Sequence, residues 1–126
     1  MWFTAGRAGF YLSWALKRGN IRVELWIDTG DGDANLWYFD QLYGQEPEIR
    51  GILPIPLEWI RKETQRTQRI AAHGPPHLTI DGSDADFEQM EEWAVDTMLK
   101  VAAVFRPRIR ALPDFIPPLA PAGEPA

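Results

Sequence analysis

The sequence of 126 residues contains no cysteine and only two histidines. The absence of cysteine excludes disulfide bonds and thiolate metal sites, and it is typical of proteins kept in a reducing compartment. No run of about 18 apolar residues occurs, and no basic segment with an apolar run after it opens the chain. We therefore expect a cytoplasmic protein that does not enter a membrane.

Motifs that mark common enzymes are missing as well. Ser13 lacks the glycine-flanked setting of a hydrolase nucleophile, and residues 29–33 are too acidic to hold a phosphate. The stretch Gly74-Pro75-Pro76 separates His73 from His77 and forbids the helix that would aim both at one metal ion. The sequence predicts no cofactor, no metal site and no catalytic residue, and it favours a protein that is not an enzyme.

Regular alternation of apolar and polar residues is the clearest pattern present. Along residues 21–28, one side of an extended backbone carries Ile21, Val23, Leu25 and Ile27, and the other carries Arg22, Glu24, Trp26 and Asp28. This pattern predicts a strand with one face on a core. Residues 10–16 alternate too, and a glycine-containing turn joins the two segments into a hairpin. Further strands are expected over 57–61 and 69–73, with 77–80 as an additional candidate.

Helical spacing appears after this hairpin. Asp31 or Asp33 is expected to cap a helix over residues 34–43, and a short helix over 47–51 follows. The longest helix begins after residue 83 and is expected to stop at Pro107. Its apolar stripe consists of Phe87, Met90, Ala94, Met98, Val101 and Phe105. The predicted fold is α+β: an antiparallel sheet of four or five strands, a long C-terminal helix packed on one face, and a shorter helix after the central strand.

The composition also predicts a domain boundary. Residues 1–111 have enough apolar side chains for a single α+β domain. Residues 112–126 are rich in proline and poor in large apolar side chains, so we expect a mostly disordered tail that is dispensable for folding. Asp114-Phe115-Ile116 is the one part of this tail that could dock on the domain.

Charge is segregated along the chain, whose net charge is −5. Residues 81–96 carry seven acids and no base, whereas residues 100–110 carry four bases and no acid. An acidic chain argues against non-specific binding of nucleic acid, although a local basic segment can still serve it. Residues 61–69 form such a segment, with four bases and one acid.

Several stretches in order resemble one bacterial family, the domain of unknown function 4268. They are Gly9 to Ser13, Val23 to Asp28, Asn35 to Leu42, Ile49, Leu57 to Trp59, Arg66 to Ile70, and Glu92-Trp93 to Phe105-Arg106-Pro107, and the likeness covers about residues 2–110. Members often lie C-terminal to domains that resemble restriction or repair nucleases. The resemblance implies an accessory module in a DNA-related context, and it implies no reaction.

The basic segment is the leading candidate site. Arg61, Arg66 and Arg69 could hold phosphates with their forked donors, and Trp59 could stack on a base. Alternatively, the arginines pair with the acidic residues of the 84–96 helix or face water.

Glu24 and Asp28 form the second candidate, because clustered carboxylates can bind Mg²⁺ for phosphodiester hydrolysis. The usual nuclease core places a lysine two residues after its glutamate, and here that residue is Trp26. A solvated or salt-bridged strand face is therefore favoured over the remnant of a metal-dependent nuclease.

Two classes of function follow from these residues. The favoured one is a non-catalytic accessory module that docks on a protein partner or forms a homodimer. The alternative is a module that binds nucleic acid through residues 61–69.

Overall fold

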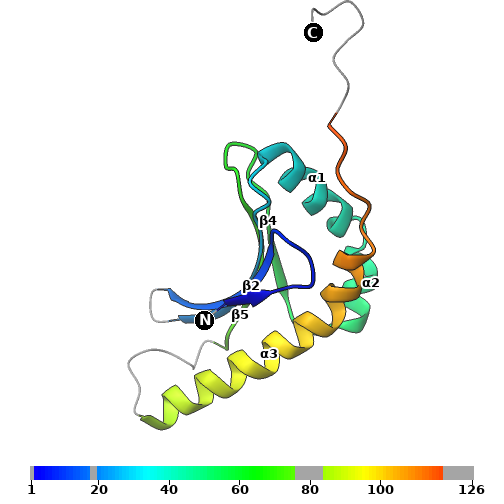
Figure 1. The fold of residues 1–126 in the computed structure, drawn as a ribbon. Coiled ribbons are helices and arrows are strands. Elements are labelled where there is room, and N and C mark those ends of the chain that lie inside the picture. The colour runs from blue at the N-terminus through cyan, green and yellow to red at the C-terminus, as the bar shows by residue number, and fades with distance from the viewer. Residues whose placement is uncertain (1, 18–19, 76–83, 118–126) are drawn as a thin grey trace, which may run out of the picture.

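The structure is a computed structural model that describes residues 2–17, 20–75 and 84–117. Within these residues, a five-stranded antiparallel sheet has the order β1-β2-β3-β5-β4 and carries its helices on one side (Figure 1). The strands are β1 (Trp2–Thr4), β2 (Phe10–Lys17), β3 (Asn20–Ile27), β4 (Leu57–Ile60) and β5 (Gln68–His73). The helices are α1 (Gly32–Tyr43), α2 (Glu46–Ile52) and α3 (Asp84–Arg110). The predicted α+β fold is confirmed.

The predicted strand at residues 21–28 is β3, the central strand of this sheet. It pairs with β2 on one side, where Tyr11 lies opposite Trp26, and with β5 on the other, where Arg69 lies opposite the same residue. The predicted hairpin of residues 10–28 is therefore present. The additional strand considered for residues 77–80 lies outside the described residues.

Alternation decides which side of the sheet each strand residue faces. The apolar residues of β3 turn toward the helices, and Ile21, Val23, Leu25 and Ile27 are each at most 1% exposed. From the opposite layer, α3 contributes Met98, Val101, Ala102, Phe105 and Ile109 to the same core. A smaller cluster lies where the first half of α3 meets the β2–β3 hairpin, and it consists of Ile21, Met90 and Ala94. Helix α3 thus packs along the sheet for most of its length.

Local signals explain how α1 and α2 begin. Asp31 precedes α1 with an extended backbone, and its Oδ1 accepts from the backbone N–H groups of Asp33 and Ala34 at 3.0 and 3.3 Å. Of the two acids predicted as caps, Asp31 is the one that acts. Helix α2 has Pro47 in its first turn, where the missing N–H leaves no partner unsatisfied.

Helix α3 continues past Pro107, so the prediction that this proline ends it is wrong. The last turn reaches Arg110, and the N–H of Ala111 still donates to the carbonyl of Pro107 at 3.1 Å. Burial of Ile109, which is fully inaccessible, favours this extra turn. At the other end, Phe87 is 48% exposed, so it does not belong to the buried stripe.

The packed part of the molecule extends beyond the boundary predicted at residue 111. Leu112 is 8% exposed and belongs to the main core, and Phe115 packs against Trp37 in a tilted arrangement with ring centroids 5.7 Å apart. Arg7 joins this segment to the domain, because it donates to the carbonyl of Leu112 at 2.6 Å and pairs with Asp114. Residues 112–115 are therefore docked, while residues 118–126 lie outside the described part.

No helix in the described ranges is both long enough and apolar enough to cross a membrane.

Candidate functional site

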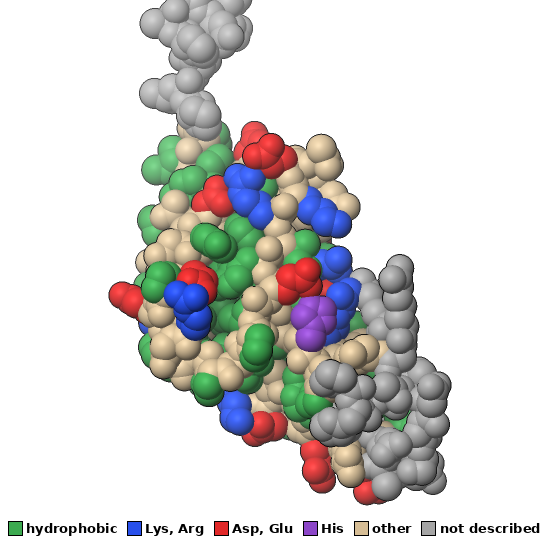
Figure 2. All heavy atoms as spheres, turned by 180° about the vertical axis from the view of Figure 1, so that it is seen from behind, with side chains coloured by type: hydrophobic (Ala, Val, Ile, Leu, Met, Phe, Trp, Pro, Cys, Tyr) green, Lys and Arg blue, Asp and Glu red, His purple; other side chains and the backbone are tan. Residues whose placement is uncertain are grey.

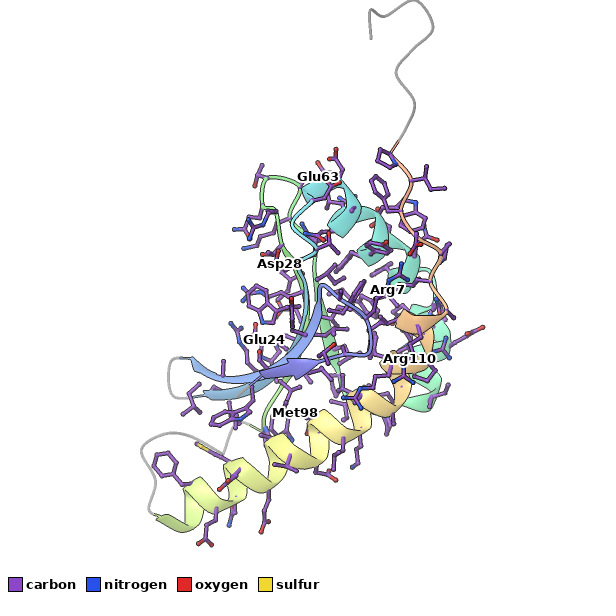
Figure 3. The ribbon with its side chains drawn as sticks, in the orientation of Figure 1. Arg7, Glu24, Asp28, Glu63, Met98 and Arg110 are labelled. Carbon is purple, nitrogen blue, oxygen red and sulfur yellow. The ribbon has the colours of Figure 1, made fainter. Side chains whose placement is uncertain are left out.

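The side of the sheet that no described helix covers, called here the open face, is built from alternate strand residues. It includes Thr4, Tyr11, Ser13, Ala15, Arg22, Glu24, Trp26, Glu58, Ile60, Arg69, Ala71 and His73. Because directly paired residues share a face, Trp26 stands between Tyr11 and Arg69 across three strands. Figure 3 shows Glu24 and Asp28 on this side of the ribbon, away from α3.

A buried carboxylate lies at the centre of the open face. Glu24 is only 2% exposed, and its Oε2 accepts from Arg69 at 3.0 Å and lies 3.6 Å from Arg22. The guanidinium of Arg69 also lies 5.2 Å from the ring centroid of Trp26, within the range of a cation–π contact. Glu24, Arg69, Arg22 and Trp26 thus form one connected cluster, and its central charge is withdrawn from water.

The loop between β4 and β5 carries most of the predicted basic segment, and two buried amides hold it in place. Gln68 accepts from the N–H of Lys62 at 2.6 Å and donates to the carbonyls of Lys62 and Gln65 at 2.8 and 3.1 Å. Asn35 donates to the carbonyl of Arg66 at 2.9 Å and accepts from Thr29. Since both amides are at most 1% exposed, these bonds fix the loop backbone in a defined position.

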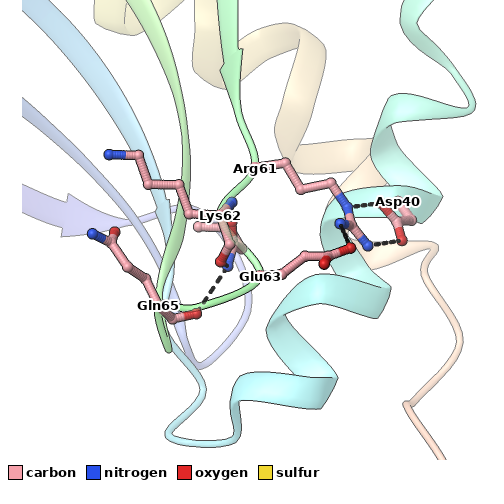
Figure 4. A network of polar contacts seen from close by, with 6 residues as sticks. Asp40, Arg61, Lys62, Glu63 and Gln65 are labelled. Carbon is pink, nitrogen blue, oxygen red and sulfur yellow. Dashed lines mark hydrogen bonds and ion pairs between the residues drawn. The ribbon is translucent and has the colours of Figure 1, made fainter.

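Arg61 leaves β4 on the helix side of the sheet. Its Nε and Nη2 donate to the two carboxylate oxygens of Asp40 at 2.8 and 3.0 Å, and its Nη1 donates to Glu63 at 2.9 Å (Figure 4). The hydrogen bonds that Arg61 donates to Asp40, and then the one it donates to Glu63, raise the pKa of its guanidinium above the ordinary value. Arg61 therefore stays charged and links the loop to α1 through its bonds to Glu63 and Asp40.

Arg66 and Lys62 lie near the end of the open face. The Nε of Arg66 is 3.4 Å from Asp28, in a pair whose side chains are 62% and 34% exposed. Lys62 borders a notch of about 150 Å³ that is also lined by Trp26, Ile60, Gln65, Thr67 and Arg69. This volume is well below the roughly 300 Å³ of the smaller ligand pockets, so the notch suits a single side chain rather than a small molecule.

The structure does not bring the four predicted nucleic-acid-binding residues together. Trp59 faces the core, where its ring lies 5.8 Å from Phe39 and 6.1 Å from Phe105. Arg61 lies on the helix side with Asp40, whereas Arg69 lies on the open face with Glu24. Among the described residues, these arginines pair with carboxylates of β3, α1 and nearby loops instead of the acidic residues of α3.

The aromatic residue beside Arg69 is Trp26 and not Trp59, the tryptophan that was predicted to accompany the arginines. The alternation that places Glu24 and Asp28 on one side of β3 places Trp26 there too. The strand register brings Trp26 next to the arginine, because β3 pairs with β5 so that Trp26 lies opposite Arg69.

Glu24 and Asp28, the candidates for a nuclease-type metal site, each face a base. Glu24 lies against Arg69 and Arg22, and Asp28 lies against Arg66. Nowhere in the described ranges do three or more acidic, histidine or cysteine side chains gather closely enough to hold a metal ion. Both carboxylates therefore act in this structure as partners of arginines.

Together these features describe an α+β module with an open, aromatic and arginine-containing sheet face. The chain belongs to the family described as domain of unknown function 4268, whose model matches residues 1–109. No curated protein and no solved structure matches the chain.

Proposed function

We propose that this chain is a non-catalytic accessory module that binds a protein partner through its open face. The observation that carries the proposal is the cluster of Trp26, Arg69 and Glu24. Its aromatic and cationic side chains lie on the open face, and its one carboxylate already faces both Arg69 and Arg22. Such a surface offers contact area without a strong field of one sign.

The residue types of the open face favour a protein over other ligands. Tryptophan, tyrosine and arginine dominate the binding energy of protein interfaces, and Tyr11, Trp26 and Arg69 form one row across the sheet. Pre-formed contacts also lower the entropy lost on binding, because Arg69 is already restrained by Glu24. The notch beside Trp26 would receive one side chain of the partner.

The distribution of charge supports the same choice. On the side of the molecule seen in Figure 2, acidic and basic side chains are interspersed and do not gather into a broad basic patch. Strong binding to nucleic acid depends on many uncompensated cations, and here Arg61, Arg66 and Arg69 each face a carboxylate. The family resemblance adds the expected class of partner, a nuclease-type protein.

The test is site-specific crosslinking in cells of the source organism. A photoreactive residue at Trp26 is expected to crosslink one nuclease-type protein. A photoreactive residue at Tyr43 is the control, because this aromatic side chain is 52% exposed but contacts Trp59 on the helix side. Equal crosslinking from both positions, or none from position 26, would contradict the proposal.

One observation favours nucleic acid as a second candidate. Lys62 and Arg66 lie on the loop at the end of the open face that also carries Trp26 and Arg69. A short single strand of nucleic acid could therefore contact cations with its phosphates and stack a base on the ring of Trp26. Three phosphate contacts would give a log–log salt slope of about −2 to −3. Titration of labelled single-stranded DNA at two salt concentrations measures this slope.

The variant chosen for this titration is Lys62→Ala with Arg66→Ala, since Arg66 forms only an exposed pair with Asp28. Loss of binding in a stably folded variant would favour nucleic acid over protein. Incubation with DNA and RNA in Mg²⁺ or Mn²⁺ is expected to give no cleavage. Cleavage that Glu24→Ala or Asp28→Ala abolishes would establish the nuclease alternative instead.

A further inference from the structure

Helix α3 carries a second surface, along the flank that is not buried against the sheet. Residues spaced by three and four positions lie on one side of a helix, and here such a series remains accessible from the first turns to the last. This α3 stripe consists of Glu88, Glu92, Val95, Leu99, Ala103, Arg106 and Arg110. Helix α3 forms one margin of the molecule, so a partner can reach this side (Figure 1).

The middle of the α3 stripe is apolar and unusually accessible. Val95 is 52% exposed and Leu99 is 64% exposed, whereas Met98, Val101 and Phe105 on the core-facing side of the same helix are buried. Together with neighbouring acids, these two residues line a shallow depression of about 460 Å³. Holes of this kind, bounded by side chains of one helix, receive the side chains of a second helix in helix pairs.

The charges at the ends of the α3 stripe have opposite signs. Glu88 and Glu92 lie toward the start of the helix, and Arg106 and Arg110 lie toward its end. Glu88, Glu92 and Arg110 have no ion-pair partner among the described residues, although Arg106 holds the carbonyl of Thr4 at 3.2 Å. The stripe therefore offers an acidic end, an apolar centre and a basic end.

We propose that a second copy of this chain packs antiparallel on the α3 stripe and forms a two-fold symmetric dimer. An axis through Leu99 places each residue opposite the one equally far along the helix on the other side of Leu99. Glu88 then meets Arg110 of the second copy, and Glu92 meets Arg106. Val95 meets Ala103, and Leu99 meets its own copy. Every position of the stripe finds a complementary partner in this register.

Self-complementarity is what selects a second copy over another partner. A symmetric interface requires one patch to match itself when reversed, and most surface patches do not meet this condition. A parallel pair would oppose acid to acid and base to base. The α3 stripe lies on the helix side of the sheet, so this inference does not rest on the proposed function of the open face.

The expected dimer is weak. The stripe is one helix wide and about 33 Å long at 1.5 Å per residue, which makes an interface smaller than the standard size for stable complexes. We expect a dissociation constant on the order of micromolar. Sedimentation equilibrium of the full chain between about 1 and 500 μM covers this range.

Leu99→Glu tests the centre of the interface, because it would oppose two carboxylates on the axis. The dissociation constant is expected to rise at least about ten-fold, while the circular dichroism spectrum stays unchanged because residue 99 faces solvent. Gln89→Arg is the control, since Gln89 lies on an exposed side of α3 outside the stripe. A monomeric wild type over the whole range, or a Leu99→Glu variant that dimerises like the wild type, overturns the proposal.

A charge exchange tests the register. Glu88→Arg alone and Arg110→Glu alone each oppose like charges at both ends of the dimer, so each is expected to weaken self-association about ten-fold or more. A mixture of the two variants restores opposite charges at both ends and is expected to form a heterodimer. The double variant Glu88→Arg, Arg110→Glu should dimerise like the wild type. Failure of both rescues would mean that these residues do not meet, and it would overturn the antiparallel register.

Discussion

At the scale of single residues, the buried carboxylate of Glu24 on the open face is the side chain whose replacement we expect to cost most stability. Glu24 sits between Arg22 and Arg69, and the cluster excludes water from its carboxylate. A buried pair of this kind costs desolvation free energy, so it is weak evidence for stability. Removing one partner alone is more harmful, because the remaining charges lose their compensation.

Glu24→Gln keeps the shape of the side chain and removes its charge. The unfolding free energy is expected to fall by about 2–4 kcal/mol, since Arg69 and Arg22 are left facing a neutral group. Urea denaturation measures the change. Glu58→Gln on the same face is the control, because Glu58 forms a half-exposed pair with His73 and its loss should cost at most about 1 kcal/mol. Equal losses in the two variants would show that burial of Glu24 does not matter.

Gly9 combines a positive φ with a close neighbour, and both disfavour any residue with a side chain. Its φ is +88°, and a Cβ there would lie 2.7 Å from Cγ2 and 2.9 Å from Cα of Thr29. Gly9→Ala is therefore expected to lower the unfolding free energy by about 2–3 kcal/mol.

The matched control for this substitution is Gly51→Ala within α2. A Cβ at Gly51 would meet nothing within 4 Å, so this variant should gain about 0.5–1 kcal/mol from better helix propensity. Thermal denaturation of both variants shows whether Gly9→Ala lowers and Gly51→Ala raises the stability. A neutral Gly9→Ala variant would mean that the β1–β2 loop can move away from Thr29.

At the scale of elements, α3 shows tertiary contacts overriding a local signal. Pro107 has no N–H to donate to the preceding turn, yet the helix continues to Arg110. Arg108 donates to Gln45 at 2.7 Å and to Glu48 at 3.0 Å, which ties the last turn to α2. Burial of Ile109 further stabilises this last turn of α3. The packing gained by the last turn outweighs the lost hydrogen bond.

Pro107→Ala should restore the missing donor in an exposed part of the helix. We expect the unfolding free energy to rise by about 1–2 kcal/mol, less than the full cost of an internal proline because the helix has already adapted. Pro113→Ala, outside the helix, is the control and should lose about 0.4–1 kcal/mol by loosening the unfolded chain. Destabilisation by Pro107→Ala would show that the proline favours the observed path of α3.

At the scale of the whole molecule, the C-terminal segment closes the domain. Arg7 from the β1–β2 loop donates to Tyr38 of α1 at 3.1 Å and to the carbonyl of Leu112 at 2.6 Å. Tyr38 in turn accepts from the N–H of Phe115 at 2.9 Å. The start of the chain, α1 and the segment after α3 are thus joined through two side chains.

A chain ending at Ala111 loses the burial of Leu112 and Phe115 and leaves Arg7 without Asp114. We expect a loss of about 3 kcal/mol, and a fall in Tm of about 10 °C for a domain of this size. A chain ending at Pro117 keeps all of these contacts and is expected to melt close to the full chain. Identical Tm values for the two shortened chains would show that Leu112 and Phe115 add nothing to the stability of the domain.

The elements themselves follow from local patterns that any fold must respect. Alternation along residues 21–28 specified β3 and its buried face, because side chains of a strand point to opposite sides in turn. Asp31 specified the start of α1, because a carboxylate satisfies free N–H groups wherever a helix begins. The family resemblance was equally readable, and residues 1–109 match its model.

The partners of the charged residues were settled only by the tertiary structure. Arg61 and Arg69 are close in sequence, yet they lie on opposite sides of the sheet and meet Asp40 and Glu24. Trp59, expected beside them, turned inward because it pairs with Ile70 on the core face. Contacts between distant residues depend on strand register and on how elements pack, and a local sequence pattern contains neither.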